Sequence, residues 1–356
     1  MLTFLKNFWG TIAVCIIFGF IAALWGWENN KEVGAAQYLW IFFILLVLEI
    51  SLSFDNAVVN ASILKNWNAL WRMLFLTIGV LIAVFGMRLI FPLLVVALTT
   101  DMSLTETWFL AINQPDEYSS ILLKHHEEIA AFGGVFLLLI FLNFFCKTDK
   151  TTLWIVKIEK FFSKLGNING VAIFITLSSL LIVSSNLPPE KKSGIIIFGL
   201  WGLVIYLAID VLSQALAPKK NTTNIDAIKR GTIGGFIYIE VLDASFSIDA
   251  VVGAFAITKD VVIIMLGLGA GAMAVRSITI YLIQKGTLNE LIYLEHGAHY
   301  AIGALALIMI ASVHFHIPEI ITGTVGLLLV AIAAYHSIIV KKKKNRVPES
   351  QEILKL

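Results

Sequence analysis

Long runs of apolar residues alternate with short polar segments along almost the whole chain. A helix of about 20 residues crosses the hydrocarbon core of a bilayer, and most of the runs are close to that length. The pattern predicts ten spans, at residues 8–26, 37–62, 72–98, 129–146, 171–187, 194–214, 233–257, 260–283, 298–313 and 319–340. We therefore expect an all-α polytopic membrane protein that contacts the lipid bilayer.

The polar segments between the spans differ in charge. If the N-terminus lies in the cytoplasm, 19 of the 26 Lys and Arg residues fall in cytoplasmic segments and 5 in segments on the other side. Such a bias is typical of membrane proteins, whose cytoplasmic loops carry the excess of positive charge. Ten spans then place both termini in the cytoplasm, with residues 341–356 as a basic cytoplasmic tail.

The composition supports this class and excludes others. Residues of the hydrophobic class make up 58% of the chain and charged residues 14%, and the net charge is +2. This composition excludes a soluble enzyme and a disordered chain, and it argues against a nucleic-acid partner. The two cysteines, Cys15 and Cys146, lie far apart in apolar runs and predict neither a disulfide nor a thiolate metal site.

Two stretches of the chain resemble each other. EISLSFDNAVV begins at Glu49, and DASFSIDAVV begins at Asp243. They lie on the second and the seventh predicted spans, which are five positions apart in the order, so they cross the membrane in opposite directions. The sequence thus predicts an inverted repeat of about five spans in each half, with residues 1–190 as the first copy and 191–340 as the second. Inverted repeats place a substrate site near the midplane, between the copies.

The resemblance continues beyond the motifs and defines a three-helix core in each half. Each motif precedes a span with one arginine, Arg88 or Arg276. Each arginine span precedes a helix start with a histidine, His126 or His296. His299 follows one turn after His296. These histidines lie at span ends, where they could relay ions or protons at the mouths, or simply pack at the interface.

Five carboxylates fall within the apolar spans: Glu49, Asp55, Glu240, Asp243 and Asp249. An ionised carboxylate at the bilayer centre costs several kcal/mol, so these positions mark function. Two arginines cannot neutralise five acids. Some of the acids should pair with arginine and the others should face a cation, and the sequence leaves open which acids do which.

Further oxygen donors accompany the acids: Ser51, Ser53, Ser245, Ser247 and Asn56. Carboxylates, hydroxyls and amides are hard ligands that suit Mg²⁺, Ca²⁺ or Mn²⁺ better than Cu⁺. The cation would be the transported substrate, and we expect no permanently bound cofactor.

Helical geometry restricts which groups can meet. At 100° per residue, Glu49, Ser53 and Asn56 share one face of a helix, whereas Ser51 and Asp55 share another. The helix must therefore unwind near residues 51–55, or Glu49 and Asp55 must serve different partners.

At these motifs the sequence resembles the TerC family, named for tellurium resistance, within the LysE-like transporter group. The resemblance covers roughly residues 37–146 and 233–313 and includes LEHGAHYAIGAL. It implies a bacterial inner-membrane exporter of a divalent metal, chiefly manganese. The proposed ion ligands of the family fall on Glu49, Asp55, Asn56, Asp243 and Asp249. Ala250 stands where the first motif has Asn56.

Other functions have less support. HExxH, GxSxG and nucleotide-binding patterns are not usefully placed, so we expect no enzyme. Two alternatives stay open: a proton-coupled exporter of another small solute, and an intramembrane aspartate hydrolase.

Overall fold

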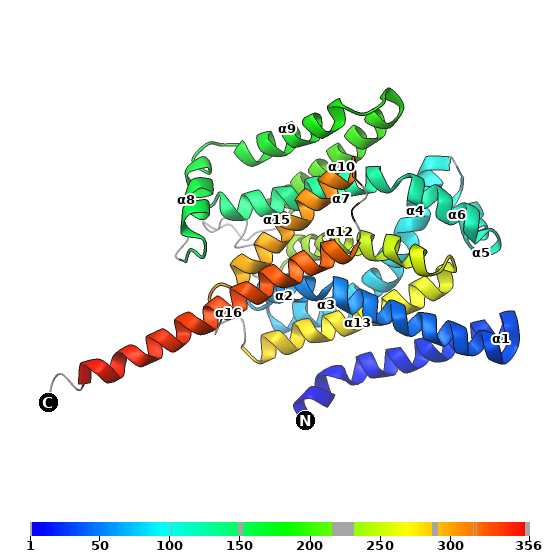
Figure 1. Ribbon diagram of the computed structural model, residues 1–356, viewed down its shortest axis with the longest axis horizontal. Coiled ribbons are helices and arrows are strands. Elements are labelled where there is room, and N and C mark those ends of the chain that lie inside the picture. Colours follow the sequence, from blue (N-terminus) through cyan, green and yellow to red (C-terminus); the bar gives the residue numbers. More distant parts are fainter. Residues whose placement is uncertain are drawn as a thin grey trace.

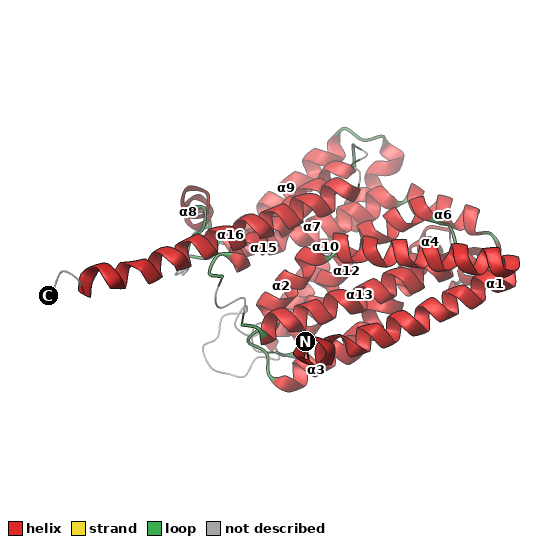
Figure 2. Cartoon of the chain, turned by 60° about the horizontal axis from the view of Figure 1, so that its bottom comes forward, coloured by secondary structure: helices red, strands yellow, loops and turns green. Residues whose placement is uncertain are grey.

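The computed structural model describes residues 2–100, 102–148, 152–215, 231–286, 291–315, 317 and 319–352. These residues form helices joined by short loops, without strands (Figure 2). The helices are α1 (Leu2–Leu52), α2 (Phe54–Leu64), α3 (Ala69–Leu81), the π-helix η1 (Ile82–Ile90), α4 (Phe91–Thr100), α5 (Leu104–Asn113), α6 (Pro115–Lys124), α7 (His126–Phe145), α8 (Val156–Leu165), α9 (Val171–Ser185), α10 (Pro189–Ala215), α12 (Ile233–Ile257), α13 (Val261–Gln284), α15 (Leu294–Ser312) and α16 (Glu319–Glu352).

The helices confirm an all-α polytopic membrane protein. Among the described residues, 8 helical segments are long and apolar enough to cross a membrane. They coincide with eight of the ten predicted spans. The shorter apolar helix α9 and the 25-residue α12 occupy the other two predicted positions.

The first two spans form a hairpin within α1, which turns back on itself between Gly26 and Gly34 (Figure 1). The two arms are close enough that a Cβ on Gly26 would overlap the carbonyl of Gly34. Both arms pack against α13. The Thr11 hydroxyl lies 2.7 Å from that of Ser277, which ties the first arm to the second half of the chain.

Equivalent helices of the predicted repeats pack against each other in opposite directions. Gly134 of α7 lies against Ile310 of α15, while Phe144, ten residues later, stacks on His299. Gly79 near the end of α3 likewise faces Arg276 of α13. Antiparallel packing of equivalent helices is the arrangement that two inverted copies require, and the division near residue 190 stays a prediction.

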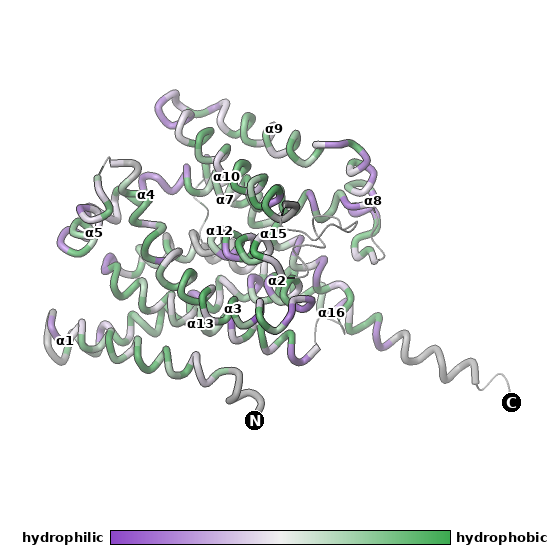
Figure 3. Tube along the Cα trace, turned by 180° about the vertical axis from the view of Figure 1, so that it is seen from behind, coloured by the Kyte–Doolittle hydropathy of each residue, from purple (hydrophilic) through white to green (hydrophobic). Residues whose placement is uncertain are grey.

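The outer faces of the bundle are apolar. Phe20, Trp40, Phe174 and Ile182 are more than half exposed, with exposed fractions of 65%, 63%, 72% and 67%. Figure 3 shows hydrophobic stretches along the length of the long helices and hydrophilic residues mainly at their ends. The helices therefore contact lipid along these faces.

Three short helices lie between the spans, where the apolar pattern gives no signal. They are α5, α6 and α8. A capping box between Ser103 and Glu106 begins α5, and the hydrogen bonds from Ser103 lower the pKa of the Glu106 carboxyl. At the other end of the chain, α16 continues through the basic segment to Glu352 and projects from the bundle (Figure 1).

Candidate functional site

The first motif contains a helix break. Helix α1 ends at Leu52 and α2 begins at Phe54, with Ser53 between them at φ −106° and ψ 14°. Glu49 therefore lies at the end of one helix and Asp55 in the first turn of the next. Helical geometry had left two alternatives, an unwound segment near residues 51–55 or two acids with different partners, and the structure has both a break at Ser53 and different partners for Glu49 and Asp55.

The break also places Ser51 and Asp55 in different environments. Ser51, predicted to share a face with Asp55, is exposed on α1, whereas Asp55 is buried in α2. The expected shared face is lost because the turn at Ser53 interrupts the helical register between them.

Glu49 forms a buried ion pair with Arg88. The closest atoms, Arg88 Nη2 and Glu49 Oε1, are 2.5 Å apart, and the two residues are 4% and 1% exposed. The Ser53 hydroxyl donates to the same carboxylate oxygen at 2.8 Å. Arg88 Nη1 donates to the carbonyl of Ala83 within the π-helix η1. The hydrogen bonds of the pair thus come from groups of the first half of the chain.

Arg276 binds two carboxylates of the second motif. Its Nη2 lies 3.0 Å from Glu240 Oε2 and 3.0 Å from Asp243 Oδ2. Its guanidinium lies 4.0 Å from the centre of the Phe75 ring, and Nη1 donates to the Phe75 carbonyl at 2.8 Å. This cluster therefore crosses from the second half of the chain to the first.

Glycines of one half accommodate the charged groups of the other. A Cβ on Gly79 would overlap Glu240 and Arg276, and a Cβ on Gly271 would overlap the side chain of Glu49. The close approach of the two halves at the acids thus depends on residues without a side chain.

Asp55 differs from these acids. It is 6% exposed, and its Oδ1 accepts the backbone N–H of Asn56 at 3.0 Å. Its Oδ2 lies against Gly326 of α16, so close that a Cβ there would overlap it. No ion pair joins Asp55 to a lysine or arginine among the residues that the structure describes.

The rest of the second motif is less fully described. Asp249 and Ser247 lie on α12, but their side chains are outside the described residues. Ser245 is buried and donates to the carbonyl of Val241 in its own helix. Among the described residues, no group of three or more His, Cys, Asp or Glu residues is arranged as a metal site.

The predicted histidines lie at two opposite ends of the bundle. His126 begins α7, whereas His296 and His299 begin α15, beside the end of α7. His296 Nδ1 lies 3.0 Å from Glu159 Oε2. His299 stacks on Phe144 at 3.5 Å between ring centres. His126 therefore lies apart from His296 and His299.

Glu159 fixes the short helix α8 to the start of α15, where His296 lies. Its Oε1 accepts the backbone N–H groups of Trp154 and Ile155, each at 3.1 Å. Burial opposes ionisation of this carboxyl, but the hydrogen bonds and the charge of His296 outweigh it and lower the pKa of Glu159. Trp154 in turn donates to His336 of α16 at 3.0 Å.

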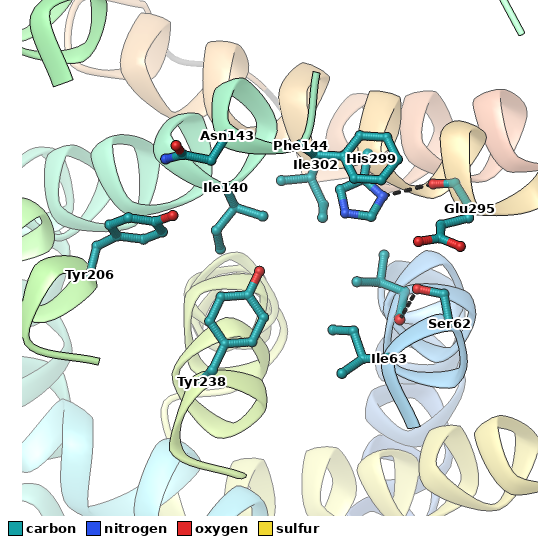
Figure 4. A pocket seen from close by; sticks show the side chains of 11 residues that line it. Ser62, Ile63, Ile140, Asn143, Phe144, Tyr206, Tyr238, Glu295, His299 and Ile302 are labelled. Carbon is teal, nitrogen blue, oxygen red and sulfur yellow. Dashed lines mark hydrogen bonds between the residues drawn. The ribbon is translucent and has the colours of Figure 1, made fainter. Parts of the chain in front are cut away.

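A cavity of about 70 Å³ opens beside His299 (Figure 4). Apolar and polar side chains line it, and the polar ones are Ser62, Asn143, Tyr206, Tyr238, Glu295 and His299. The hydroxyl of Tyr238 points toward Ile140 across the cavity in Figure 4. Lys65 forms an ion pair of 3.1 Å with Glu295.

Sequence reasoning missed three residues at these sites. Asn60 donates to Asp243 Oδ1 at 3.3 Å, Gly326 faces Asp55, and Glu159 pairs with His296. A signal existed for Asn60, since it lies four residues after Asn56 and therefore on the same side of the helix. Gly326 and Glu159 come from segments outside the motifs and carry no comparable signal.

Comparison with known proteins places the chain in a family. No curated protein and no solved structure matches it. One family model, described as "Protein of unknown function (DUF475)", matches residues 54–344. This match covers most of the chain, including α2, Arg88 and the whole second motif. The protein therefore belongs to the DUF475 family.

Proposed function

We propose that the protein exports a divalent metal ion, with manganese as the principal candidate, through a site between the two repeats. The observation that carries the proposal is that some of the buried acids are paired with arginine and one is not. Three of the four predicted intramembrane carboxylates with described side chains are bound to arginine, whereas Asp55 is buried without such a partner. A carboxylate that is ionised at such a buried position is stabilised by a cation beside it.

The groups near Asp55 suit a hard cation. Asn56 follows it, and Asn60 and Asp243 meet one turn further along α2. All of these supply oxygen atoms, which Mg²⁺, Ca²⁺ and Mn²⁺ prefer. Arg276, bound to Glu240 and to the Phe75 carbonyl, would then hold the two halves together, and Asp55 would bind the ion.

The ion would reach the site by way of the cavity beside His299. Val59, Ser62 and Ile63 of α2 line it, and they follow Asp55 by one to two turns. We propose that this end faces the cytoplasm of a bacterial cell, since Lys65 and Arg72 follow α2 in a predicted cytoplasmic loop. The direction of transport rests on the resemblance to the TerC family.

Flux measurements in vesicles test the proposal. Purified protein is reconstituted, and Mn²⁺ movement is followed with an enclosed metal-sensitive dye. Asp55→Asn should abolish the flux while the protein stays folded. Asp116→Asn makes the same chemical change at an exposed surface position and should leave the flux unchanged. Normal flux in the Asp55→Asn variant would refute the proposed role of this carboxylate.

A further inference from the structure

Two buried amides of α2 have an oxygen without a partner. Asn56 and Asn60 are 2% and 0% exposed. Among the described residues, neither Asn56 Oδ1 nor Asn60 Oδ1 has a hydrogen-bond partner. The two residues lie one turn apart on the same side of the helix, so the two oxygens belong to one strip of the surface of α2.

An unpaired buried carbonyl is unfavourable, and native proteins contain few of them. Such a group therefore points to something that binds it. The side-chain nitrogen of Asn60 already donates to Asp243 Oδ1 at 3.3 Å, across the boundary between the two predicted repeats. The amide is thus held beside a carboxylate, with its oxygen still available.

The spacing at this contact matches that of two ligands on one cation. In an octahedral shell with metal–oxygen distances between those of Mg²⁺ and Ca²⁺, neighbouring oxygens are about 2.9 to 3.5 Å apart. A half-turn of the Asn60 amide would place Oδ1 near the present position of Nδ2, 3.3 Å from Asp243 Oδ1. Both oxygens could then bind the same ion.

Neighbouring groups fix the orientation of the Asp243 carboxylate. Its other oxygen, Oδ2, is fixed by Arg276 at 3.0 Å, and Arg276 is anchored by Glu240 and the Phe75 carbonyl. Groups that orient a ligand in this way strengthen metal binding. Oδ1 is consequently directed at Asn60.

We propose that Asn60 and Asp243 form a cation site between the cavity and Asp55, with Asn56 on the same strip. This inference rests on the proposed function and adds a ligand and a second ion position to it. In the predicted repeat, Ala254 occupies the position equivalent to Asn60. An amide is therefore present at this position in one half alone, next in sequence to Val59, which lines the cavity.

Mn²⁺ binding to the purified full-length protein in lipid nanodiscs tests this site. The electron paramagnetic resonance signal of free Mn²⁺ gives the dissociation constant. Asn60→Leu keeps the branched shape of the side chain and removes the oxygen, and it should weaken binding about tenfold or more, because a bond to a charged group is lost. Thr279→Val removes another buried polar group, whose hydroxyl donates to the Val275 carbonyl within α13, and should leave binding unchanged.

Asn60→Asp keeps an oxygen at the same position. Without metal, its charge should repel Asp243, so Mn²⁺ should raise the melting temperature of this variant more than that of the wild type. This measurement decides the question if Asn60→Leu does not fold. An equal response of Asn60→Asp and wild type would overturn the proposal and indicate a structural water at Asn60.

The outcomes separate the two proposals. If Asp55→Asn weakens binding and Asn60→Leu does not, the site at Asn60 is refuted and the proposed function stands. If the wild type binds no Mn²⁺, both proposals fail. Weakened binding in Asn60→Leu, together with a larger Mn²⁺ response in Asn60→Asp, supports the additional site.

Discussion

Replacement of Arg88 by methionine should destabilise the protein strongly, because it leaves Glu49 buried without its counter-ion. Glu49 is 1% exposed, and its Oε1 would keep one donor, the Ser53 hydroxyl, while Oε2 has no hydrogen-bond partner among the described residues. Breaking a buried ion pair by removing one partner costs about 3–5 kcal/mol. That is a large part of the roughly 5–15 kcal/mol that stabilises a typical folded protein.

A double-mutant cycle isolates the interaction. Glu49→Gln removes the charge, so the variant with both substitutions should recover most of the loss. The hydrogen bond from Arg88 to the Ala83 carbonyl, worth about 1 kcal/mol, is not recovered. Unfolding is followed by tryptophan fluorescence as the protein is titrated from a mild detergent into sodium dodecyl sulfate.

Arg72→Met is the matched control. Arg72 donates to the backbone carbonyls of Leu64 and Lys65, and it has no carboxylate partner among the described residues. Its loss should cost no more than about 1–3 kcal/mol. A loss below about 1 kcal/mol for Arg88→Met, or simple additivity of the two substitutions, would refute the ion-pair account.

Three further outcomes are expected. Gly326→Ala should lower Mn²⁺ flux with little change in expression, since the added methyl group overlaps the Asp55 carboxylate; unchanged flux would show that this oxygen is not needed where it lies. The lowered pKa of Glu159 means that its contribution to stability is complete above the ordinary value of 4.5 and is lost as the pH falls through the lowered value. Melting temperatures between pH 6 and about pH 3 should therefore fall more steeply for the wild type than for Glu159→Gln, and parallel curves would contradict this. In a cysteine-free background, a cysteine at Lys124 should react with an impermeant reagent from outside whole cells, and one at Lys341 should not; the reverse pattern would invert the predicted orientation.

The spans were predictable because a bilayer imposes a simple requirement on length and hydropathy. The break at Ser53 was one of two alternatives that helical geometry left open, and the sequence did not decide between it and different partners for Glu49 and Asp55. The hairpin within α1 illustrates the limit, because helical geometry persists through the turn where the polar residues predicted a loop.

The pairing of the acids could not be derived from the sequence. The sequence indicated that arginines would bind some of the acids, but Glu49 and Arg88 are 39 residues apart, and Arg276 takes both Glu240 and Asp243. Such choices depend on how helices approach one another. Asn60 was overlooked for the same reason, since only its contact with Asp243 across the interface distinguishes it from other amides in apolar helices.

The bond from Arg276 to the Phe75 carbonyl joins residues 201 positions apart and has a consequence for synthesis of the protein. At about 5–20 residues per second, the ribosome makes Arg276 roughly 10–40 s after Phe75. During that interval Glu49 can already find Arg88, whereas the surface around Gly79 has no counterpart. The first half is therefore in the membrane before the helix that packs on it has been made. Until α13 is inserted, a lipid or an insertion factor must cover the surface around Gly79.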